Sequence, residues 1–174
     1  MTVFAKPVLG FAAWSGTGKT TLLVKLLPLL KQRGIRVAMI KHAHHDFDID
    51  QPGKDSYELR KAGADQVLIA SSQRRALITE TPAGGDPDLW ELVASLDLEN
   101  TDLVLVEGFR HVAFPKIELH RPSNRKELLY PPDHSIIAVA SDQPVDTAAL
   151  PLLDINDPHE IMEFIEHWLK TAAA

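Results

Sequence analysis

The fold of this chain is decided by the stretch Ala13-Trp14-Ser15-Gly16-Thr17-Gly18-Lys19-Thr20, which follows an apolar run over residues 7–12 and precedes a leucine-rich run over 22–30. A strand that ends in a glycine-rich loop and opens a helix is the arrangement of a phosphate-binding loop, or P-loop. The pattern G-x-x-x-x-G-K-[ST] is met except at its first position, where Ala13 replaces glycine. A chance glycine-rich turn would explain neither Lys19 nor the order of elements. The stretch therefore predicts a site for a nucleotide phosphate.

Each residue type in this loop has a physical reason to be there. Gly16 and Gly18 let backbone N–H groups turn toward a phosphate, where a Cβ would obstruct the approach. The helix that begins near Lys19 adds the positive end of its dipole. Lys19 is expected to bridge the β- and γ-phosphates, and the Thr20 hydroxyl to ligate Mg²⁺. The expected nucleotide-binding residues of the loop and first helical turn are Trp14, Ser15, Gly16, Thr17, Gly18, Lys19, Thr20 and Thr21.

The composition indicates one globular domain. A length of 174 residues suits a single domain, expected over residues 1–174, and 45% apolar with 24% charged residues is ordinary for a folded protein. A net charge of −6 argues against nucleic acid as the main partner. The absence of cysteine excludes disulfides, thiolate metal sites and iron–sulfur clusters.

The apolar runs also bear on where the protein acts. None approaches the roughly 20 residues that a membrane helix requires. The apolar start of the chain resembles a signal-peptide core, but cleavage after Ala13 would cut the phosphate loop in two. We therefore expect a cytoplasmic protein with no membrane partner.

Alternation of short apolar runs with helical patterns predicts an α/β fold of the P-loop NTPase class, with three layers, a mostly parallel sheet and a β-hairpin insertion. Helices are expected from Asp86 and from Asp157, each an N-cap followed by proline, and Glu160 completes a capping box at the second. Pro28 should kink the first helix or loosen one of its turns. The expected strands are 8–13, 35–41, 66–70, 76–80, 103–106, 116–120 and 136–140, and the remaining helices are about 18–33 and 55–62.

A second nucleotide element follows the most apolar of these strands. Residues 102–108 form a hydrophobic strand that ends in Glu107 and Gly108. P-loop proteins place an acidic residue at this point to hold Mg²⁺ and its water. Glu107 is therefore expected to act with Thr20 at the metal and with Lys19 in catalysis, and Gly108 to approach the γ-phosphate. The alternative is an ordinary solvent-facing strand end.

The loop 42–50 follows the second strand, whose carboxyl end is expected to face the nucleotide. It contains three histidines and three aspartates. A metal site, a switch loop that responds to phosphate and a solvated polar loop all remain open. The residues proposed for a switch loop are His45, Asp46 and Asp48, the last two near the water shell of Mg²⁺.

The base is poorly specified by the sequence. Many GTPases read guanine with Asn-Lys-x-Asp after a late strand, and here only Asp142 of that motif is present. Asp142 either reads guanine or starts a turn with Pro144. No residue is identifiable as a water-orienting group, and Arg110 and Arg121 are arginine-finger candidates only because they lie near strand ends.

Several longer segments carry a more specific resemblance. These are residues 12–21, Ile-Lys-His-Ala-His-His-Asp (40–46), Pro-Gly-Lys-Asp-Ser-Tyr-Glu-Leu-Arg-Lys-Ala-Gly (52–63), Val-Glu-Gly-Phe (106–109) and Leu-Leu-Asp-Ile-Asn-Asp (152–157). Together they closely resemble the molybdopterin-guanine dinucleotide biosynthesis adaptor family, protein B of that pathway, over essentially the whole chain.

The resemblance implies a GTP-binding P-loop fold, a homodimer and weak GTP hydrolysis. It also implies assistance to the guanylyltransferase that joins GMP to molybdopterin, so that GTP, Mg²⁺, the transferase and molybdopterin are the expected partners. Two alternatives remain on the same fold. One is a small-molecule kinase with arginines at 74–75 and 121–125 in a lid, and the other is a nickel-insertion GTPase, suggested by the clustered histidines.

Overall fold

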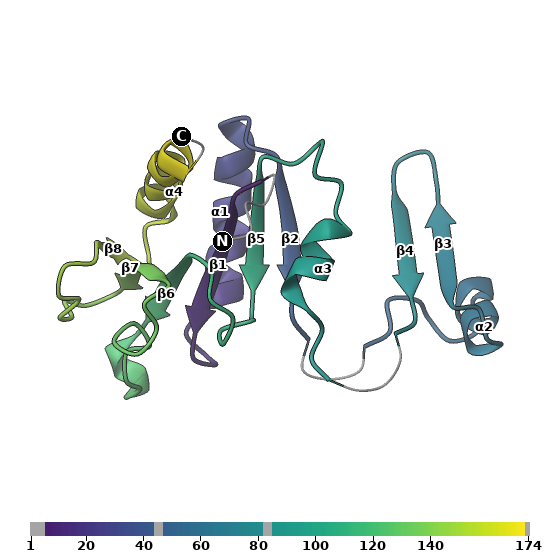
Figure 1. Ribbon diagram of the computed structural model, residues 1–174, viewed down its shortest axis with the longest axis horizontal. Helices are drawn as coiled ribbons and strands as arrows, with labels where there is room; N and C mark the ends of the chain where they lie inside the picture. Colours follow the sequence, from purple (N-terminus) through teal and green to yellow (C-terminus); the bar gives the residue numbers. More distant parts are fainter. Residues whose placement is uncertain (1–5, 44–46, 82–84, 173–174) are drawn as a thin grey trace. The chain divides into compact units, whose positions relative to one another are not determined.

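The computed structural model describes residues 6–43, 47–81 and 85–172, and these belong to two compact units (Figure 1). The first unit comprises residues 1–42 and 88–174, and the second comprises residues 43–87. The single domain expected over the whole chain stays a prediction. None of the helices in the described ranges is long and apolar enough to cross a membrane.

The first unit is built on a six-stranded sheet with the order β2-β5-β1-β6-β7-β8. Every pair of neighbouring strands in it is parallel, so all carboxyl ends lie at one edge. The predicted parallel sheet is confirmed, and β1 lies near its middle. The strands are β1 (Val8–Ala13), β2 (Val37–Lys41), β5 (Leu103–Glu107), β6 (Lys116–His120), β7 (Ile136–Ser141) and β8 (Leu152–Asp154).

Helices cover both faces of this sheet, which confirms the three predicted layers. Alternate side chains of a strand point to opposite faces, and those of β5 divide between two apolar clusters. Leu103 and Leu105 pack with α1 (Lys19–Gln32) and α4 (Pro158–Ala172). Val104 and Val106 pack with α3 (Leu89–Ala94). The buried apolar stripe of α1 consists of Leu22, Leu23, Leu26 and Leu30.

Local capping differs from the sequence prediction at two helices. The N-cap of α3 is Asp88, not Asp86, and its carboxylate accepts hydrogen bonds from the N–H groups of Trp90 and Glu91. Asp157 caps α4 as predicted, by accepting from His159 N–H at 2.9 Å. The Glu160 carboxylate accepts from the N–H of Asp154, not from that of Asp157, and so fixes the end of β8 to the helix. α1 continues as one α-helix through Pro28.

The second unit contains α2 (Asp55–Lys61) and the predicted hairpin, formed by β3 (Gln66–Ala70) and β4 (Arg75–Thr79). Its polar centre is the buried side chain of Arg60 on α2. The Arg60 guanidinium donates to the carboxylates of Asp48, Asp50 and Glu80. The hydrogen bond from Arg60 holds the pKa of the Asp50 carboxyl below its usual range. This cluster joins the loop before α2, the helix and the end of the hairpin.

Candidate functional site

The predicted phosphate loop leaves β1 at Ala13 and enters α1 at Lys19. Gly16 has φ 80° and Gly18, the N-cap of α1, has φ 96°, so both occupy the left-handed region that glycine tolerates best. The Thr17 side chain is buried, and its hydroxyl donates to the carbonyl of Trp14 at 2.7 Å. This buried hydrogen bond stabilises the loop on its interior side, whereas Ser15, Gly16 and Thr20 are exposed.

Lys19 and Glu107 come together at the carboxyl ends of two neighbouring strands. β1 and β5 pair so that Phe11 lies beside Glu107. The Lys19 Nζ lies 3.8 Å from Glu107 Oε1, with side-chain exposures of 22% and 15%. A bound phosphate could take the Lys19 ammonium, which would free the carboxylate for a metal-bound water. With the Thr20 hydroxyl, these oxygen donors fit the preferences of Mg²⁺, which keeps several waters and uses phosphate oxygens.

Gly108 is required by a close approach of two chain segments. Its φ is 101°, and a Cβ built on it would lie 2.6 Å from the Cβ of His42. The N–H of His42 donates to the carbonyl of Glu107 at 2.8 Å, and the His42 ring stacks on Phe109 with centroids 4.5 Å apart. The end of β2 is therefore fixed against the segment that follows β5.

The structure describes the predicted polar loop 42–50 only in part. His44, His45 and Asp46 lie outside the described residues. Asp48 belongs to the second unit, where it pairs with Arg60. Among the residues that are described, no group of three or more metal-ligating side chains of His, Asp or Glu is placed to hold an ion. The switch-loop and metal roles of this loop stay predictions.

Trp14, at the start of the phosphate loop, is held from several sides. Its indole Nε1 donates to the carbonyl of Glu127 at 2.9 Å. The Arg110 guanidinium lies 5.0 Å from the centroid of a Trp14 ring, and the Lys126 ammonium lies 5.5 Å from it. These are cation–π distances. Arg110, one of the two arginine-finger candidates, therefore lies over the first part of the loop.

Residues 121–135, here called the β6–β7 loop, contact the phosphate loop and are anchored by buried charges of β6. Glu118 is buried and accepts hydrogen bonds from the N–H groups of Leu129 and Tyr130. Burial raises the pKa of the Glu118 carboxyl although these two bonds act to lower it. Lys116 donates to Asp133 and to Ser135. At its other end the loop reaches Thr17 through Arg121 and Asn124.

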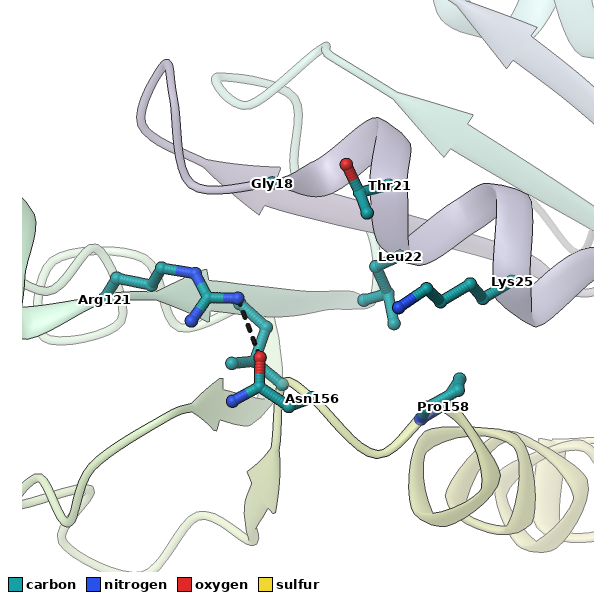
Figure 2. A pocket seen from close by; sticks show the side chains of 8 residues that line it. Gly18, Thr21, Leu22, Lys25, Arg121, Asn156 and Pro158 are labelled. Atoms are coloured by element: carbon teal, nitrogen blue, oxygen red, sulfur yellow. Dashed lines mark hydrogen bonds between the residues drawn. The ribbon is translucent and has the colours of Figure 1, made fainter.

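A pocket of about 180 Å³ lies beside the start of α1 (Figure 2). Arg121, the other arginine-finger candidate, points across it to Asn156 and also pairs with Asp142 at 2.6 Å. Asp142, the predicted guanine reader, has one carboxylate oxygen in this pair. Its other oxygen, Oδ1, is buried and has no hydrogen-bond partner among the described residues. The pocket is lined by Gly18, Thr21, Leu22, Lys25, Arg121, Ile155, Asn156 and Pro158.

Of these lining residues, Gly18 and Thr21 belong to the predicted nucleotide-binding set, whereas Lys25 and Asn156 do not. Lys25 lies one turn beyond the recognised motif, on the face that Thr21 presents. Asn156 follows β8, a three-residue strand with no periodicity to reveal it. A helical spacing of four from Thr21 was the one signal that could have found Lys25.

A glycine-rich loop joins β1, near the middle of the parallel sheet, to α1. The neighbouring strand in the sheet, β5, ends in the acidic residue Glu107. This arrangement defines a fold of the P-loop NTPase type. The chain belongs to the family described as "Molybdopterin guanine dinucleotide synthesis protein B", whose model matches residues 8–142.

Individual relatives agree with this membership. The molybdopterin-guanine dinucleotide biosynthesis adapter protein of Escherichia coli (strain K12) is 54% identical over 170 residues, 94% of either chain. The protein of the same description from Haemophilus influenzae is 47% identical, over 94% of this chain and 89% of its own. A crystal structure of molybdopterin-guanine biosynthesis protein B superposes with a TM-score of 0.75 at 29% identity, and the match covers 94% of this chain and 99% of that one.

Proposed function

We propose that this chain is a GTP-binding adapter in molybdopterin-guanine dinucleotide biosynthesis, which assists the guanylyltransferase that attaches GMP to molybdopterin. The adapter role is supported by relatives that match nearly the whole chain and are themselves described as molybdopterin-guanine dinucleotide biosynthesis adapter proteins. The proposal of nucleotide binding rests on the 3.8 Å distance between Lys19 Nζ and Glu107 Oε1, beside a loop whose glycines adopt left-handed backbone conformations. The cytoplasm, where GTP is available, is the proposed location.

The proposed binding mode follows from the positions of these groups. The N–H groups of residues 15–20 and the Lys19 ammonium hold the phosphates. Thr20 and Glu107 would hold Mg²⁺, which would supply charge neutralisation for a bound triphosphate. The base and ribose occupy the pocket beside Gly18 and Thr21. Asp142, whose Oδ1 is buried without a partner among the described residues, is joined to the wall of this pocket by its ion pair with Arg121, and we propose that it takes part in reading the base.

We propose that the isolated protein hydrolyses GTP slowly, well below the roughly 1–10³ s⁻¹ of typical enzymes. The two arginines nearest the site support this, because Arg110 lies over Trp14 and Arg121 is bonded to Asp142 and Asn156. GTPases without a free arginine at the γ-phosphate turn over slowly. Slow hydrolysis suits a protein whose bound nucleotide matters to a partner.

The adapter proposal is tested by reconstituting guanine dinucleotide formation from molybdopterin, Mg·GTP and the transferase, with phosphate release followed in parallel. Wild type is expected to increase product formation, and Lys19→Ala to lose that increase. A His44→Ala, His45→Ala double variant tests whether the loop 42–50, with Arg110, meets the transferase. If product formation is the same with and without the wild-type protein, the adapter role is refuted and only nucleotide binding remains.

We further propose a homodimer that forms through the hairpin of the second unit. Leu68 and Leu77 are cross-strand partners and are 62% and 58% exposed. A two-stranded sheet is marginal alone, and both of its strands are edges open to further pairing. A second copy of the same hairpin presents the same apolar pair and the same edges, which suits a closed two-fold contact.

Charging this pair is expected to dissociate the dimer. A Leu68→Asp, Leu77→Asp variant would place like charges opposite one another at the proposed contact, and its mass by light scattering should fall to that of one 19.3 kDa chain. The control is Val24→Asp, because Val24 is 65% exposed on α1 of the first unit. A wild-type monomer at tens of micromolar, or a variant that remains dimeric, would contradict this contact.

A further inference from the structure

One side chain, Arg121, contacts three segments that are far apart in the sequence. Its Nε donates to the carbonyl of Thr17 at 3.0 Å. Its Nη1 donates to Asp142, just after β7, and its Nη2 donates to Asn156, just after β8, at 2.9 Å (Figure 2). A single guanidinium therefore joins the phosphate loop to the ends of two strands beside the pocket.

The chemistry of the guanidinium makes this a rigid connection. Its N–H donors lie in one plane at fixed angles, so that a shift of Asp142 or Asn156 changes the position of Nε relative to Thr17. A lysine in the same place would keep the charge but could not hold three acceptors in a fixed plane.

Arg121 contacts the phosphate loop at the peptide group between Thr17 and Gly18. The Thr17 carbonyl and the Gly18 N–H belong to the same peptide, directly before α1. Donation to the carbonyl polarises that peptide and strengthens its N–H as a donor to an anion. Loss of the Arg121 contact would weaken this donor and loosen the Thr17 carbonyl.

The same residue forms part of the pocket wall. Arg121 and Asn156 both line the pocket, as do Gly18 and Thr21 from the start of α1. A ligand that fills the pocket therefore contacts Arg121 itself and Asn156, one of the three acceptors that hold the guanidinium in place. The Asp142 carboxylate is joined to this wall through its ion pair with Arg121.

Resting on the nucleotide-binding function proposed above, we propose that Arg121 is a positioning residue that couples the nucleoside pocket to the phosphate loop. The base and ribose in the pocket fix the guanidinium plane, and the fixed plane holds the Thr17–Gly18 peptide toward the triphosphate. The nucleoside then contributes more to affinity than its own contacts would supply.

The test compares two probes, Mg·GTP and Mg·tripolyphosphate, by calorimetric titration. The ratio of the tripolyphosphate Kd to the GTP Kd measures what the nucleoside adds. Arg121→Lys keeps the charge and removes the planar fork, and Arg121→Ala removes both. Arg125→Ala is the matched control, because Arg125 is an exposed arginine four residues further along the same loop. Thermal melting shows whether each variant is folded.

In Arg121→Lys, we expect the tripolyphosphate Kd to stay within a few-fold of wild type and the ratio to fall by about tenfold, within the usual range of coupling between sites. Arg125→Ala should leave the ratio unchanged. If Arg121 acts through its neighbours, Asn156→Ala alone should lower the ratio. The same substitution should cause little further decrease in a protein that already carries Arg121→Lys.

Four results would overturn the proposal. Arg121→Lys could weaken the binding of both probes by the same factor, or leave the affinity for both unchanged. Either outcome would refute the coupling and leave the proposal of nucleotide binding intact. Fully additive losses in the Arg121→Lys, Asn156→Ala double variant would show independent contacts instead of coupling. If wild type binds neither probe, the nucleotide proposal fails and the coupling fails with it.

Discussion

Lys19→Ala is expected to weaken Mg·GTP binding by about ten- to a hundredfold. Hydrogen bonds to charged groups contribute about 1.5–3 kcal/mol, and the Lys19 ammonium stands 3.8 Å from Glu107, where a phosphate would meet it. Removal of the Lys19 ammonium also leaves the Glu107 carboxylate without its cationic partner, so that it repels an anionic ligand. Calorimetric titration at fixed Mg²⁺ measures the change.

The matched control for this variant is Lys31→Ala, which removes the same charge from the last turn of the same helix. Its Kd should equal that of wild type. An unchanged affinity in a folded Lys19→Ala protein would falsify the assignment of the phosphate loop.

Asp133→Ala is expected to destabilise the first unit by about 3 kcal/mol, because it leaves a buried ammonium without its carboxylate. Lys116 is 1% exposed and donates to Asp133 at 2.8 Å, and the partly exposed Asp133 places the loss at the lower end of the usual range. Chemical denaturation followed by circular dichroism measures the difference. The control is Glu99→Ala, which removes an exposed carboxylate and should change stability by less than about 0.5 kcal/mol.

The same pair has a defined pH dependence. Burial alone would raise the pKa of the Asp133 carboxyl, but hydrogen bonds from Lys116 and Ser135 outweigh it and lower that pKa. A carboxyl with a lowered folded-state pKa stabilises fully above its unfolded pKa of about 3.9, and this stability is lost as the pH falls through the lower folded value. The stability difference between wild type and Asp133→Ala should therefore shrink in acid. A stability difference that grows as the pH falls would contradict this assignment. So would a Lys116→Met, Asp133→Ala double variant that is no more stable than Asp133→Ala, because removal of the buried ammonium should restore stability.

Local patterns determined most of the fold. The bounds of β1 agree with the predicted strand, and α1 lies within one residue of the predicted helix at each end, because an apolar run, a glycine turn and a leucine stripe all specify the same structure. The second strand begins at Val37, two residues later than predicted, because both the backbone N–H and the guanidinium of Arg36 donate to the Asp102 side chain. β8 was missed because three residues at a sheet edge carry no detectable period.

The approach of Lys19 to Glu107 could be predicted from the sequence, whereas the meeting of Arg121 with Asp142 and Asn156 could not. Lys19 and Glu107 belong to motifs whose spacing specifies their place, and the parallel pairing of β1 with β5 brings them together. Arg121, Asp142 and Asn156 meet only because β6, β7 and β8 are successive neighbours in the sheet. That order depends on long-range packing. The sequence singled out Asp142 and the segment 152–157 separately, but no short motif shows that they meet at Arg121.

The central claim, that this chain carries a Mg²⁺-dependent site for GTP, is tested most directly by titrating the wild-type protein with GTP and with ATP, each with Mg²⁺ and with EDTA. We predict saturable GTP binding that weakens strongly in EDTA, and a preference over ATP of at least about tenfold, because a buried group that accepts hydrogen bonds from guanine is left unpaired against adenine. The preference should fall in Asp142→Ala if that residue reads the base. No heat of binding for either nucleotide would contradict the claim outright, and equal affinity for the two would contradict its guanine part.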